Sequence, residues 1–145
     1  VGLKQGGYSA EELRAAGFTG VELKQAGFSA TELKQLGLSL QELKEVGFSL
    51  DDLRDEFGAR ELKRTGFSLE EMQKAGIGMD ALKRLSFQAF DWKQSGYGAQ
   101  ELLDLGFSLV QVKEAGFSAS QLKLLGSSAA DLQEAGFGLL DLRKA

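Results

Sequence analysis

A ten-residue unit recurs along the whole chain and constrains its fold more than any other feature. Its consensus is Gly-Phe-Ser-Ala-x-Glu-Leu-Lys-x-Ala. A partial repeat at residues 1–6 precedes fourteen repeats, which start at Gly7, Gly17, Gly27, Gly37, Gly47, Glu56, Gly66, Gly76, Ser86, Gly96, Gly106, Gly116, Gly126 and Gly136. A fixed short period is typical of repeat architectures, so we expect one repeat domain over residues 1–145.

Each repeat carries the signals of one short helix. Position three is usually Ser or Thr and position six Glu or Gln, as in Ser29 and Glu32, which is the pattern of a capping box at a helix N-terminus. Good helix formers follow, and the glycine that opens the next repeat suits the left-handed residue after a helix C-terminus. The sequence therefore predicts an all-α chain with one two-turn helix per repeat.

The aromatic residue at position two is expected to contact leucines on both sides. Relative to the preceding helix it pairs with the preceding leucine, and relative to the next N-cap it pairs with the following one, so Phe28 should contact Leu23 and Leu33. The predicted framework comprises Phe18, Phe28, Phe48, Phe67, Phe107, Phe117, Phe137, Leu13, Leu23, Leu33, Leu43, Gly17, Gly27, Gly37 and Gly47.

A helix of about seven residues is too short to be stable alone, since isolated helices need roughly 12–15 residues. Stability must come from stacking on neighbouring repeats. Because the Gly-Phe-Ser junction is nearly constant, each junction should impose the same rotation. We therefore predict a superhelical α-solenoid of about fourteen short helices.

Two breaks interrupt the pattern. The repeat that starts at Gly47 is one residue short, and Glu56 replaces the next glycine. One hypothesis is a longer helix over roughly residues 50–65; the alternative is a strained but normal junction. In the second break, Ser86 replaces glycine, and Trp92 on the leucine position is expected in the core. Phe90 is a candidate partner contact, or else a local packing adjustment.

The chain contains no His and no Cys, which excludes thiol or imidazole catalysis and metal sites built on those ligands. The acidic residues at position six are explained by capping and lack the spacing of a calcium loop. We therefore expect no enzyme activity, no metal and no cofactor. No targeting or membrane-spanning segment is present in the sequence, so a soluble chain is expected.

Position eight is basic in most repeats. A regular ladder of cations could follow a phosphate backbone, as in helical-repeat RNA readers. The alternative, favoured by a net charge of −4, is that these cations lie near helix C-termini with their stems over apolar surface.

Positions five and nine vary most between repeats and, lying four residues apart, share one helix face. A constant framework with one varied face is typical of a binding surface, although neutral variation on a solvent face gives the same pattern. The candidate partner-binding residues are Phe90, Val21, Val110, Leu124 and Leu140.

The chain resembles an α-solenoid of the tetratricopeptide, HEAT or pentatricopeptide kind with a much shorter repeat, although the signature residues of those families do not match. The decapeptide is similar to short helical arrays among repeat proteins, and the resemblance implies architecture only.

Three functions remain open at this level. The first is a scaffold that binds protein or peptide; the second is a structural spacer or filament segment without a ligand; the third and weaker is nucleic-acid binding along the basic ladder. Because the chain starts within a repeat and lacks polar end repeats, we expect an excised or designed array that associates end to end.

Overall fold

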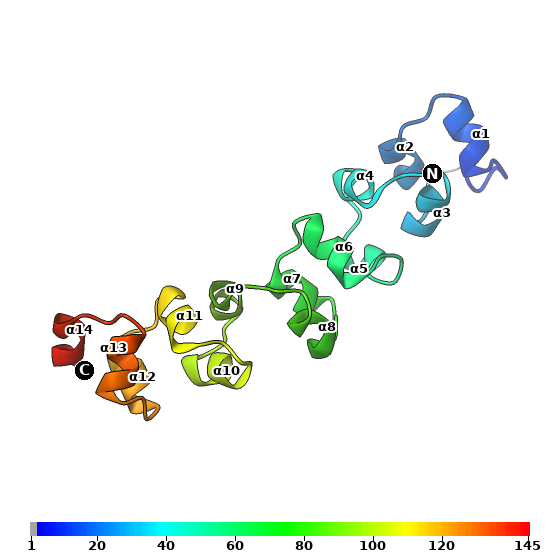
Figure 1. Ribbon diagram of the computed structural model, residues 1–145. Coiled ribbons are helices and arrows are strands. Elements are labelled where there is room, and N and C mark those ends of the chain that lie inside the picture. Colours follow the sequence, from blue (N-terminus) through cyan, green and yellow to red (C-terminus); the bar gives the residue numbers. More distant parts are fainter. Residues whose placement is uncertain (1–2) are drawn as a thin grey trace. The chain divides into compact units, whose positions relative to one another are not determined.

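The computed structural model describes residues 3–145 and shows fourteen short α-helices, one for each complete repeat (Figure 1). No β-strand occurs in this part of the chain. The helices are α1 (Ala10–Ala15), α2 (Gly20–Gln25), α3 (Ala30–Gln35), α4 (Leu40–Glu45), α5 (Leu50–Leu53), α6 (Ala59–Arg64), α7 (Leu69–Lys74), α8 (Met79–Lys83), α9 (Ala89–Gln94), α10 (Ala99–Asp104), α11 (Leu109–Glu114), α12 (Ala119–Leu124), α13 (Ala129–Glu134) and α14 (Leu139–Lys144). The expected all-helical fold is confirmed.

Most helix N-termini in residues 3–145 are closed by capping boxes, as predicted. The Glu32 amide donates to Ser29 Oγ at 3.2 Å, and the Ser29 amide donates to Glu32 Oε2 at 2.8 Å. Each side chain thereby satisfies one backbone amide that lacks a partner within the helix. The same reciprocal pair occurs at the other Ser and Thr caps, which are Ser9, Thr19, Ser39, Ser49, Ser68, Ser108, Ser118 and Ser128.

The helix C-termini end at a left-handed glycine, as the sequence predicts. Gly27 has φ 96°, its amide donates to Lys24 O at 2.9 Å, and the Phe28 amide donates to Leu23 O at 3.1 Å. This pair of bonds is the Schellman motif, which satisfies two carbonyls of the last turn. It places the aromatic residue of each junction at a constant position relative to the preceding leucine.

The hypothesis of one helix over residues 50–65 is wrong. α5 ends at Leu53 and α6 begins at Ala59, and Glu56 has no positive φ. The Phe57 amide still donates to Leu53 O, at 3.0 Å, and the ring is only 8% exposed. Because this repeat has one residue fewer, a helical hydrogen bond replaces the left-handed glycine at the junction. The Phe57 amide thereby keeps the carbonyl of the preceding leucine as its acceptor.

The second break keeps a left-handed residue at the junction, at the expense of backbone strain. Ser86 has φ 51°, the one positive value at a non-glycine residue within residues 3–145. Trp92 is 2% exposed and packs edge-on against Tyr97, with ring centroids 4.9 Å apart. The expectation that Trp92 belongs to the core is confirmed.

The core is a column of position-seven side chains covered by the aromatic residues. Leu33 and Leu43 are fully buried, and Leu13 and Leu23 are nearly so. Of the predicted aromatic framework, Phe28, Phe48, Phe67, Phe117 and Phe137 are buried, whereas Phe18 and Phe107 are half-buried. The leucine positions therefore form the most protected part of each helix.

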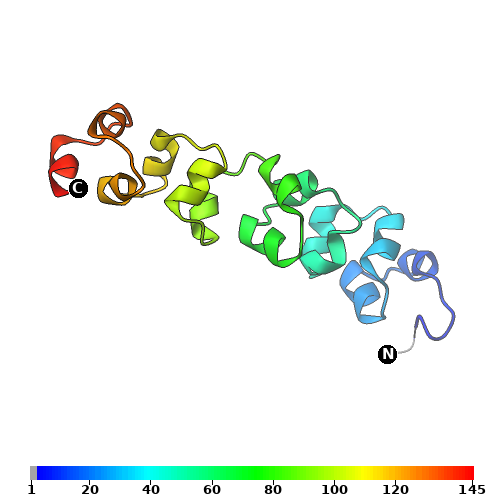
Figure 2. The same ribbon diagram turned by 90° about the horizontal axis from the view of Figure 1, so that it is seen from below.

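The helices gather into two compact units, one up to Ala81 and one from Leu82 to Ala145. In the first unit, successive helices pack together, as α2 does with α3 and α3 with α4. In the second unit, alternate helices also pack, with α9 against α11 and α12 against α14 (Figure 2). Side-chain contacts between alternate helices occur in both units, as between Lys44 and Thr65 and between Lys93 and Ala115.

No helix within residues 3–145 is long and apolar enough to cross a membrane.

Candidate functional site

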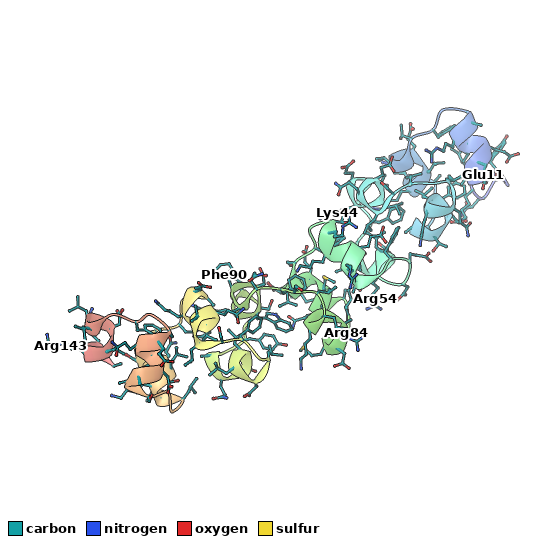
Figure 3. The ribbon with its side chains drawn as sticks, in the orientation of Figure 1. Glu11, Lys44, Arg54, Arg84, Phe90 and Arg143 are labelled. Atoms are coloured by element: carbon teal, nitrogen blue, oxygen red, sulfur yellow. The ribbon has the colours of Figure 1, made fainter. Side chains whose placement is uncertain are left out.

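The basic side chain at position eight reaches the helix two repeats further along the chain. Lys44 extends from α4 to the C-terminal end of α6, where its Nζ donates to Thr65 O at 2.9 Å (Figure 3). The same ammonium group lies 4.3 Å from the centre of the Phe67 ring. A cation near helix carbonyls and over an aromatic face is stabilised by both. We call this pair of contacts the lysine clamp.

The clamp recurs in both compact units. Within residues 3–145, cations at position eight donate to carbonyl oxygens at these places: Lys4 to Gly27, Arg14 to Leu36, Lys24 to Gly47, Lys34 to Glu56, Lys44 to Thr65, Arg54 to Ala75, Lys93 to Ala115 and Gly116, Lys113 to Gly136, and Lys123 to Ala145. Among these cations, the lysines that also lie over a ring are Lys4, Lys24, Lys34, Lys44, Lys93 and Lys113. Most of the basic ladder is therefore engaged within the described part of the chain.

Whether position eight is lysine or arginine depends on whether an aromatic residue follows the carbonyl that the cation contacts. The six lysines over rings cover phenylalanines, whereas Arg14 and Arg54 bond to carbonyls that are followed by Leu38 and Ile77. Without a ring face to attract a cation, arginine still offers several donors to the carbonyl. We did not predict this relation from the sequence, although a comparison of position eight with the later aromatic position would have revealed it.

Glu56 shows how the deletion is accommodated by neighbouring repeats. Thr31 donates its hydroxyl to Glu56 Oε1 at 2.6 Å, and the Lys34 ammonium lies 3.6 Å from Glu56 Oε2. The carboxylate that replaces glycine is thus held by α3, and Lys34 donates to the Glu56 carbonyl as well.

A groove recurs between alternate even-numbered helices. It has a volume of about 390 Å³ between α2 and α4 (groove 2–4), about 330 Å³ between α4 and α6 (groove 4–6) and about 370 Å³ between α10 and α12 (groove 10–12). Volumes of this size fall within the range of small-ligand pockets. The recurrence follows from the repeat, because equivalent positions line each groove.

The lining combines position five of one helix with positions nine and ten of the alternate helix. Position five is Val21, Gln41 and Gln100 in the three grooves. Positions nine and ten are Glu45 with Val46, Arg64 with Thr65, and Leu124 with Leu125. Each groove therefore has its own chemistry on a constant frame.

Groove 2–4 combines apolar walls with carboxylates. Glu42 accepts from the Ser39 amide at 2.8 Å and from the Ser39 hydroxyl, and these hydrogen bonds, with the charge of Arg14, lower the pKa of Glu42. Glu45 accepts from Gln41 Nε2 at 2.8 Å. Gly20 lies on the floor, where an added Cβ would come within 2.8 Å of Val46 Cγ2.

The candidate partner-binding residues divide into two groups. Val21 lines groove 2–4 and Leu124 lines groove 10–12. Phe90, Val110 and Leu140 are exposed but line none of these three grooves, and Phe90 lies on α9 in Figure 3. Position five of one helix and position nine of the alternate helix line the same groove, in addition to sharing the face of one helix.

These features define a class of protein: a tandem array of short helices that are joined by constant caps and linked to their second neighbours by position-eight cations. The family model described as Decapeptide repeat region matches residues 2–57, 55–118 and 86–145. These matches cover almost the entire chain, which therefore belongs to this family. Comparisons with curated proteins and with solved structures gave no significant match.

Proposed function

We propose that this chain is a non-catalytic α-solenoid scaffold that binds protein or peptide segments in the grooves between alternate helices. One observation carries the proposal: equivalent grooves recur, and their linings differ at positions five, nine and ten while the leucine core stays constant. Concave sites with several apolar side chains and a few polar groups are the usual setting for recognition.

The hydroxyl and cationic groups of the repeats have structural roles that support a non-catalytic function. Serine hydroxyls at position three accept helix amides, and most position-eight cations donate to carbonyls, as in Ser29 and Lys44. The engaged cations have less freedom to follow a phosphate backbone, which favours peptide over nucleic acid as the partner.

The proposal is tested by selecting binders from a library of displayed random peptides and mapping each selected peptide by amide chemical-shift changes in the labelled chain. The expected result is a set of peptides whose shifts cluster at groove residues and which bind at least tenfold more weakly to variants changed at Val21, Arg64 or Leu124. A control variant changed at exposed Val110, which lines none of these grooves, should bind as the parent does.

Failure to select any peptide, or shifts scattered without relation to the grooves, would favour a spacer without a ligand.

A further inference from the structure

Groove 10–12 lies where the chain lacks both halves of a lysine clamp. Position eight of α10 is Leu103, and the aromatic position after α12 is Ser127. In other clamped repeats the cation donates to the carbonyl at position ten or at the next position one, which here would be Leu125 O or Gly126 O. Within residues 3–145, no side chain donates to either oxygen, so two acceptors at the end of α12 remain open.

The same groove exposes apolar surface beside those carbonyls. Leu124 is 87% exposed and Leu125 is 40% exposed, and both line the groove with Ala99 and Phe117. Contiguous exposed apolar side chains are typical of interaction sites. Leu125 contributes its side chain to the apolar wall of the groove, and its carbonyl lies at the adjoining end of α12.

The charges around this groove favour a cation. α10 carries Glu101 and Asp104 and has no basic residue in its last turn. Glu101 Oε2 accepts from the Gly98 amide and Asp104 Oδ1 accepts from Gln100 Nε2, but neither carboxylate forms an ion pair within the described part of the chain. An incoming lysine or arginine would thus meet carbonyl oxygens and, in the wall of the groove, the Glu101 carboxylate.

We propose that groove 10–12 binds a partner segment in which an aromatic residue adjoins a lysine, so that the partner supplies the clamp that the chain lacks. The aromatic side chain packs against Ala99, Leu124 and Leu125, while the ammonium group donates to the carbonyls at the end of α12. The chain itself shows this chemistry in the Lys93 contact with the Ala115 and Gly116 carbonyls and the Phe117 ring. The inference rests on the proposed function and names the partner for one groove.

The test uses three synthetic ten-residue peptides in a glycine-serine background. One contains Phe next to Lys, the second replaces that Lys with Glu, and the third replaces that Phe with Ala. Titration into the isotope-labelled full chain should shift the amides of Gly98, Leu125 and Gly126 with the first peptide. Each of the other two should bind at least tenfold more weakly.

Two variants separate the clamp from a general apolar contact. Leu103→Lys combined with Ser127→Phe rebuilds the internal clamp and should weaken binding of the first peptide at least tenfold. Leu124→Asp changes a side chain too exposed to affect folding and should weaken binding similarly, whereas Leu140→Asp, 70% exposed and outside the groove, should leave binding unchanged.

Unchanged binding to the rebuilt-clamp variant, equal binding of the Glu peptide, or no shifts at millimolar peptide would overturn the inference. Shifts confined to groove 2–4 or groove 4–6 would overturn it too, yet would support the proposed function. The peptide-library selection tests that function independently, so the two failures are distinguishable.

Discussion

The ammonium group of Lys44 lies over the Phe67 ring, 4.3 Å from its centre, and donates to Thr65 O next to it. Lys44 belongs to α4, whereas both contacts lie at the end of α6. One side chain therefore ties together two helices that are separated by a whole repeat. Because helices of four to six residues are unstable alone, such links between second neighbours add to the stability that the leucine core provides.

Replacing Lys44 by Met should lower the free energy of unfolding by about 1–2 kcal/mol, because a charge-assisted hydrogen bond and a cation–π contact are lost while most of the apolar stem is kept. Lys74→Met is the matched control. Lys74 is 74% exposed and pairs with Glu70 on its own helix, so its loss should change stability much less than the loss of Lys44. Denaturant unfolding measures both, and equal effects would contradict the role of the clamp.

Gly27→Ala should destabilise the chain by about 1 kcal/mol, since φ 96° is unfavourable for any residue with a Cβ, although the added methyl group would meet no atom within 4 Å. Ser86→Gly should have the opposite sign, because Ser86 already adopts φ 51°. Thermal unfolding of both variants tests the relation. A stable Gly27→Ala variant would show that the left-handed junction is not required.

Gly20→Ala and Val46→Ala should be coupled. A Cβ at residue 20 would lie 2.8 Å from Val46 Cγ2 and 3.2 Å from Leu38 Cδ2, so the first change overpacks the contact between α2 and the end of α4. Removing the Val46 methyl groups relieves that clash. A double-mutant cycle should therefore give a favourable coupling of about 1 kcal/mol or more, whereas additive effects would contradict the close approach.

Stability should fall as the pH drops below the ordinary carboxylate range. The capping carboxylates of Glu22, Glu32, Glu42, Asp52, Glu71 and Asp131 have pKa values below their ordinary 4.5 or 3.8. For Glu22, Glu42 and Glu71 the main cause is the hydrogen bond from the cap amide; for Asp52 and Asp131 it is the bond from the cap hydroxyl, and for Glu32 it is Lys4. Their stabilisation is full above the unfolded-state pKa and is lost as pH falls through the lower folded-state pKa.

Glutamine provides the control for this pH dependence. Gln111 and Gln121 close their capping boxes with Oε1 at 2.8 Å from the cap amides and cannot titrate. Converting Glu22, Glu42 and Glu71 to Gln should flatten the acid limb of a plot of melting temperature against pH. An unchanged acid limb would assign the loss of stability to other carboxylates.

Much of the local structure could be predicted from the sequence because its determinants lie within one repeat. The Ser29–Glu32 capping box, the left-handed Gly27 and the buried Leu33 depend on residues a few positions apart. The same reasoning failed at Glu56, where the loss of glycine suggested a continuous helix. The Phe57 amide kept its Leu53 acceptor through a shorter turn, and α3 held the carboxylate.

The sequence by itself determined the helices, their caps and the column of leucines, because short-range hydrogen bonds and periodicity decide these. Only the tertiary structure decided which residues come together across repeats: Lys44 with Phe67, Gly20 with Val46, and Ala99 with Leu125 as lining residues of groove 10–12. Such pairs depend on the rotation at each junction. Small differences in backbone angles set that rotation, and the sequence of a single repeat does not reveal them.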